Sequence, residues 1–71
     1  MSLTDVQGGK RVRFVAVDGG RVLQGRLAAL GLVPGAEIQV VQNEGRGPVI
    51  LSVGSSRMAL GRGMADKILV I

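Results

Sequence analysis

Residues 21–42 read RVLQGRLAALGLVPGAEIQVVQ, and the spacing of the apolar residues changes within this stretch. The first ten residues place leucines at i, i+4 and i+7, the spacing of one helix face: Leu23, Leu27 and Leu30. In the last six residues, apolar and polar side chains alternate from Glu37 and Ile38 onward, as in a half-buried strand. The stretch therefore predicts a short helix over 21–30 and a strand over 37–42.

Between these two elements stand Gly31 and the pair Pro34-Gly35. Gly31 follows the last periodic leucine, where a residue in the left-handed conformation commonly ends a helix. Pro34 fixes its own φ and Gly35 accepts a positive φ, a combination typical of a type II turn. We therefore expect the chain to leave the helix abruptly and to reverse into the following strand.

Outward from this centre, four more segments have the composition of short strands. They are 10–17, 49–53, 58–60 and 68–71. Asp18-Gly19-Gly20 ends the first of them in a turn, and 61–66 is long enough for one helical turn. Five short strands, tight glycine turns and one short α-helix between strands 1 and 2 predict a mainly β chain. The predicted fold is a small SH3-like five-stranded barrel, forming a single domain over 1–71.

The core of this domain must be built without covalent or metal cross-links. Hydrophobic residues make up 46% of the 71 residues, but Phe14 is the only aromatic one. Cys and His are both absent, so neither a disulfide nor a structural zinc is available to a chain whose core is small. A barrel that covers its own sheet edges, or a homo-oligomer, would supply the missing stability.

Catalysis and metal binding lack their usual residues. General acid–base chemistry most often uses His or paired carboxylates. The chain has no His, and its five acids stand apart: Asp5, Asp18, Glu37, Glu44 and Asp66. Without a His base the serines cannot form a Ser-His-Asp arrangement, and transition metals favour the missing Cys and His. We therefore predict no catalytic residue, no metal ligand and no cofactor, and expect a non-enzymatic protein that acts by contact.

Membrane insertion and secretion find no support in the sequence. A transmembrane helix needs about 18 or more consecutive apolar residues. The most apolar window, 27–36, is interrupted by two glycines and a proline. Residues 1–5 contain no basic region followed by an apolar run, which a secretory signal would require. The expected location is the cytoplasm, with no direct membrane span.

The chain is basic, with nine Lys and Arg against five Asp and Glu and a net charge of +4. Lys10, Arg11 and Arg13 form a basic face on the first predicted strand, and a small basic β-barrel that binds nucleic acid is the alternative function. Single-strand binders of this size usually pair such a face with stacking aromatics. Because Phe14 is needed in the core, both nucleic acid and an aromatic groove for Pro-rich peptides are disfavoured.

Several short pieces of the sequence, taken in order, resemble the FeoA family of the bacterial ferrous iron uptake system. They are Arg26-Leu27, Leu30-Gly31, Pro34-Gly35, Met58-Ala59-Leu60, Ala65 and Ile68-Leu69-Val70. The resemblance implies an SH3-like barrel and an accessory or regulatory role in transition-metal uptake. It also implies a partner, the membrane ferrous iron transporter FeoB with its cytoplasmic G-protein domain. That partner would hold the protein at the inner face of the membrane.

The surface that we expect to meet the partner is the helix and the turn after it. Its candidate residues are Arg26, Leu30, Leu32, Val33 and Pro34. Leu32 and Val33 carry the argument, because they are apolar in a turn where polar residues are the usual choice. The alternative for Leu32 is that it covers one end of the barrel.

Overall fold

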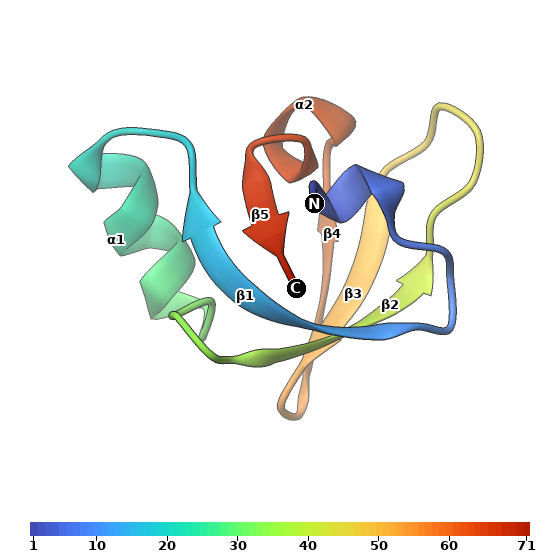
Figure 1. The fold of residues 1–71 in the computed structure, drawn as a ribbon, viewed down its shortest axis with the longest axis horizontal. Helices are drawn as coiled ribbons and strands as arrows, with labels where there is room; N and C mark the ends of the chain where they lie inside the picture. The colour runs from blue at the N-terminus through green and yellow to red at the C-terminus, as the bar shows by residue number, and fades with distance from the viewer.

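The computed structural model describes residues 1–71, and its strands outnumber its helices (Figure 1). In chain order the elements are the 3-10 helix η1 (Leu3–Asp5), β1 (Arg11–Val17), α1 (Arg21–Ala29), β2 (Glu37–Gln42), β3 (Val49–Val53), β4 (Ser56–Leu60), α2 (Arg62–Ala65) and β5 (Ile68–Val70). The mainly β architecture is confirmed, with α1 between the first two strands. Only η1 was not expected from the sequence.

The five strands form one antiparallel sheet in the order β4-β3-β2-β1-β5. Figure 1 shows the sheet curling round, with η1 and α2 together at one end and α1 beside β1. The two edge strands, β4 and β5, do not pair with each other. The free edge of β5 is covered instead by the N-terminus, where the N–H of Val70 donates to the Met1 carbonyl at 2.8 Å. The free edge of β5 is therefore paired with the N-terminal segment rather than with β4.

The core is one cluster of thirteen buried residues, all of them apolar. Alternation along the strands supplies most of it: Ile38 and Val40 are buried in β2, and Val49 and Leu51 are buried in β3. Helix α1 contributes a single buried residue, Leu27. Most of the surface of α1 is therefore left to solvent, although the sequence had placed three leucines on one face.

The junction after α1 has the predicted backbone. Gly31 adopts a φ of 92°. Its N–H donates to the Ala28 carbonyl at 2.9 Å, while the Leu32 N–H donates to the Leu27 carbonyl at 2.9 Å. This pair of bonds is the Schellman motif, in which the residue after the glycine packs against the last turn of the helix. Leu32 and Leu27 are accordingly both buried, so the motif draws Leu32 into the core.

Candidate functional site

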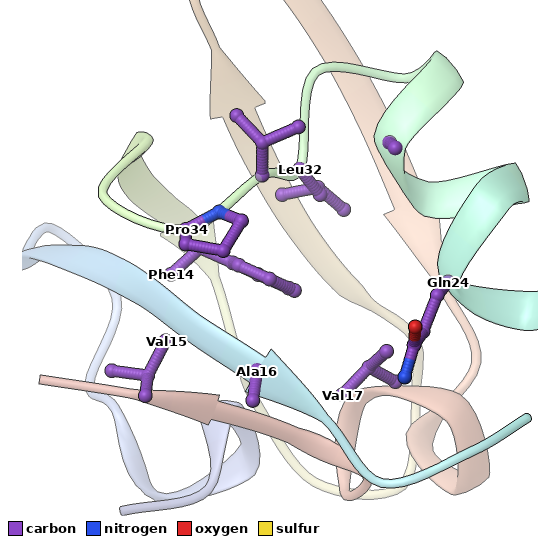
Figure 2. A pocket seen from close by; sticks show the side chains of 9 residues that line it. Phe14, Val15, Ala16, Val17, Gln24, Leu32 and Pro34 are labelled. Atoms are coloured by element: carbon purple, nitrogen blue, oxygen red, sulfur yellow. The ribbon is translucent and has the colours of Figure 1, made fainter. Parts of the chain in front are cut away.

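An apolar groove of about 320 Å³ lies between α1 and β1 (Figure 2). Three segments line it: residues 14–17 of β1, Gln24 and Ala28 of α1, and residues 32–34 of the turn. Gln24 is the only one of these residues with a polar side chain. We call this feature the α1–β1 groove. It is suited to receiving an apolar group rather than to performing chemistry on one.

The β1 wall of the groove exists because the strand contains a bulge. Phe14 pairs with Val70 and Ala16 pairs with Leu69, so Val15 is an extra residue in β1. A bulge changes which face the following side chains occupy. Phe14 and Val17 are buried, whereas Val15 and Ala16 are both exposed, and Val15 exposes 45% of its surface. The bulge thus brings neighbouring apolar residues to the surface beside α1.

The apolar surface continues from the groove onto β5. Ala16 faces Leu69 across the β1–β5 ladder, and Arg13 and Ile71 exchange backbone hydrogen bonds of 2.8 and 3.0 Å. Leu69 and Ile71 alternate with the buried residues of β5 and are exposed. The surface available to a partner is therefore larger than the groove itself.

The turn wall is fixed in place by backbone hydrogen bonds. Gly35 adopts a φ of 87°, and the Ala36 N–H donates to the Val33 carbonyl at 2.9 Å, which confirms the predicted turn. The turn is tied to β1, because the Gly35 N–H donates to the Phe14 carbonyl at 2.8 Å and the Phe14 N–H donates to the Ala36 carbonyl at 2.9 Å. These hydrogen bonds therefore fix the positions of Val33 and Pro34 relative to β1.

The structure divides the predicted contact residues into three groups. Val33 and Pro34 line the groove, and Val33 exposes 44% of its surface. Leu32 is only 2% exposed and forms the floor, which agrees with the alternative that it covers one end of the barrel, while its contact with a partner stays a prediction. The cause of its burial is the Schellman motif, which turns Leu32 inward.

Arg26 and Leu30 lie away from the groove. Each is two residues from Ala28, and two residues correspond to about 200° around a helix. Both side chains are exposed, but neither lines the groove. Of the five candidates, Leu32, Val33 and Pro34 line the groove. The β1 wall of the groove was not predicted from the sequence. Its signal was the apolar run 14–17, which is too long for a strand that buries only one face.

The predicted basic face is partly occupied by contacts within the chain. Arg11 Nη1 lies 3.5 Å from Glu37 Oε1, and Arg13 Nη1 donates to the Gly35 carbonyl at 3.1 Å. Lys10 is exposed at the start of β1 and has no ion-pair partner. No aromatic side chain is exposed beside these residues, since Phe14 is buried. Nucleic-acid binding remains an untested prediction with no stacking surface to assist it.

The described residues contain no group of three or more His, Cys, Asp or Glu side chains that could hold a metal ion. None of the helices has the length and apolar character needed to cross a bilayer. A second hollow of about 330 Å³, beside the start of the chain and β1, has three hydrophobic residues among the seven that line it. The α1–β1 groove, with seven hydrophobic residues of nine, is the more apolar of the two.

The family model described as the FeoA domain matches residues 1–71, the whole of the sequence. The chain belongs to the FeoA family. This FeoA chain is 39% identical over 62 residues to Fe(2+) transport protein A of Methanocaldococcus jannaschii, a match covering 87% of the chain and 74% of that relative. The predicted FeoA resemblance is thus confirmed.

Solved structures agree with the fold of this FeoA chain. The crystal structure of an iron uptake regulatory protein (FeoA) matches with a TM-score of 0.89 at 37% identity, covering 99% of this chain and 93% of that one. The zinc complex of Stenotrophomonas maltophilia FeoA, described as a prokaryotic SH3 domain protein, matches with a TM-score of 0.85 at 26% identity. That match covers 100% of this chain and 89% of the other. The SH3-like barrel predicted from the sequence is confirmed.

Proposed function

We propose that this chain is a non-enzymatic accessory protein of ferrous iron uptake, which acts by binding the cytoplasmic part of the membrane transporter FeoB. The observation that carries the proposal is an exposed apolar groove in a chain of the FeoA family. Contact with FeoB would hold the protein at the cytoplasmic face of the membrane. Iron enters this proposal as the cargo of the transporter, not as a ligand of this chain.

The groove has two properties that favour a protein partner. Val15 and Val33 expose large parts of their apolar side chains on either side of it, and clustered exposed apolar surface commonly marks an interaction site. The groove is also preformed, because backbone hydrogen bonds join the turn to β1. A preformed site loses little conformational freedom on binding, which favours affinity.

The proposal is tested by substituting Val33 with Asp and measuring binding to the purified cytoplasmic part of FeoB by calorimetry. A charge in the apolar groove should weaken affinity by roughly tenfold or more, because the carboxylate loses its hydration when the partner covers the groove. The matched control is Val22→Asp on α1. Val22 is 73% exposed and two residues from Gln24, so it lies on the opposite side of the helix from the groove.

The expected result is a large loss for Val33→Asp and, at about 300 mM NaCl where exposed charges are screened, an unchanged affinity for Val22→Asp. Both variants should retain the circular dichroism spectrum of the parent chain, since both positions are exposed. Equal affinity of Val33→Asp and the parent chain would exclude the groove as the contact surface. Absence of any binding by the parent chain would overturn the proposed function itself.

A further inference from the structure

We infer that the segment seated in the α1–β1 groove is an apolar run of the partner with carboxylates at both ends. The inference rests on the proposed function, since it describes the partner of the same groove. It is drawn from the charges beside the two ends of the groove, Arg13 and Arg21, neither of which lies within 4.0 Å of a carboxylate.

One end of the groove is marked by Arg13. Its Nη1 donates to the Gly35 carbonyl at 3.1 Å, which places the guanidinium against the turn that carries Pro34. The side chain is exposed and forms no ion pair, because Glu37, its cross-strand neighbour, pairs with Arg11 instead. Four of the five N–H groups of a guanidinium therefore remain for a ligand at this end.

The other end is marked by Arg21, the first residue of α1. Arg21, Gln24 and Ala28 follow at i, i+3 and i+7, so Arg21 shares the helix face that lines the groove. Figure 2 shows Gln24 and Val17 at one end of the groove and Pro34 at the other. Arg21 precedes Gln24 by about one helical turn and Arg13 bonds to the turn that carries Pro34, so the two arginines belong to opposite ends. Arg21 also has no carboxylate within 4.0 Å.

The local charge balance favours an acidic ligand at the Arg21 end. The first turn of α1 holds no acidic residue, and its N-cap, Gly20, provides no side-chain acceptor for the free N–H groups. The helix dipole disfavours the positive charge of Arg21 at this position. An incoming anion would be stabilised by the dipole and by Arg21 together. Asp18 is the nearest acid in sequence and forms no ion pair.

A second copy of this chain does not fit the same description. Its net charge is +4, so a second copy is repelled at long range, and it offers no identified apolar segment with acidic ends. A partner segment with an apolar centre and acidic ends would fill the groove and pair with both guanidinium groups. Charges at the rim of an interface mainly accelerate association and fix orientation, and salt weakens them.

The inference is tested with three charge reversals: Arg13→Glu, Arg21→Glu, and the double variant. Arg46→Glu is the control, because it changes the net charge equally from the β2–β3 loop, away from α1 in Figure 1. Affinity for the cytoplasmic part of FeoB is measured by calorimetry at about 50 and about 300 mM NaCl, where screening differs strongly. Arg21→Gln removes the charge without adding an acid and serves as the milder variant.

The double variant should bind roughly tenfold or more weakly than Arg46→Glu at low salt, and each single variant roughly three- to fivefold more weakly. The parent chain should lose affinity at high salt, and the difference between the variants should shrink. Suppose that the double variant and Arg46→Glu bind equally, while Val33→Asp does not bind. The inference of carboxylates in the partner segment is then wrong, and the proposed contact at the groove is kept. If Val33→Asp also binds normally, or the parent chain does not bind, the proposed contact fails as well.

Loss of folding is controlled separately. Arg21→Glu should not destabilise α1, because an acid near the N-terminus of a helix is favourable. A reduced affinity of Arg21→Glu together with an unchanged denaturation midpoint therefore reports on the partner. Should Arg13→Glu lose stability along with its bond to Gly35, the Arg21 variants alone decide the question.

Discussion

The two sides of the barrel differ in how their backbone is held. On the α1 side, main-chain hydrogen bonds fix the turn and apolar side chains remain exposed around the groove. On the opposite side, polar side chains join η1, the β2–β3 loop and α2. One side is thus tied together by side chains, whereas the other leaves its side chains free for contact.

The polar side is organised around Asn43. Its Nδ2 donates to the carbonyls of Thr4 and Val6 at 2.9 and 2.7 Å. Its Oδ1 accepts from Arg62, which also donates from Nη1 to the Gly47 carbonyl at 2.8 Å. We call Asn43 and Arg62 the polar clasp. Because it satisfies carbonyls of segments that no sheet ladder joins, it should contribute to stability rather than to binding.

Truncating the buried Leu32 on the floor of the groove should have the largest effect on stability. Leu32→Ala removes a buried side chain from beneath the groove, and such changes cost about 2–5 kcal/mol. That is a large share of the stability of a 71-residue domain, at roughly 0.05–0.15 kcal/mol per residue. The free energy of unfolding, measured by urea denaturation, should fall by this amount. A loss below about 1 kcal/mol would indicate a surface role for Leu32, as the sequence first suggested.

Breaking the polar clasp should have the next largest effect, and on stability alone. Asn43→Ala leaves the carbonyls of Thr4 and Val6 and one Arg62 donor without their partner, which we expect to cost about 1–3 kcal/mol. Urea denaturation measures the loss. Affinity for the FeoB cytoplasmic part, measured well below the denaturation midpoint, should be unchanged. A folded Asn43→Ala variant with weakened binding would contradict the division of roles between the two sides.

Structural features that depend only on neighbouring residues could be predicted from the sequence. Gly31 and the Pro34-Gly35 turn were predicted because each conformation depends on local backbone preferences, and both glycines have the expected positive φ. Arg26 was predicted to share a contact surface with Val33 and Pro34, but it does not line the groove that they line. A helical pattern shows which residues share a face, but it does not show which strand that face lies beside.

The apolar run 14–17 was a local sign of the groove, but it could not show where the groove lies. Its β1 wall depends on the bulge at Val15, which appears only when β1 is paired with β5 at the far end of the chain. Leu32 illustrates the same limit at shorter range. An apolar residue after a helix-ending glycine can be exposed or can pack against the last turn, and the contact with Leu27 decides between them.

The smallest expected effect on stability comes from a substitution that stabilises α1 without altering the contacts of the groove. Gly25 lies within α1 at a negative φ, and a Cβ added there would meet no atom within 4 Å. Glycine inside a helix is destabilising by about 0.5–1 kcal/mol relative to alanine, so Gly25→Ala should raise the free energy of unfolding by this amount. The denaturation midpoint should rise by about 2–8 °C in a thermal scan. Gly31→Ala is the contrasting control and should lower the midpoint, because Gly31 has a φ of 92°.

If the groove is as fully formed as its hydrogen bonds indicate, a more stable α1 leaves FeoB affinity unchanged. A marked gain in affinity for Gly25→Ala would instead mean that α1 becomes ordered on binding, so that the groove side is completed by its partner.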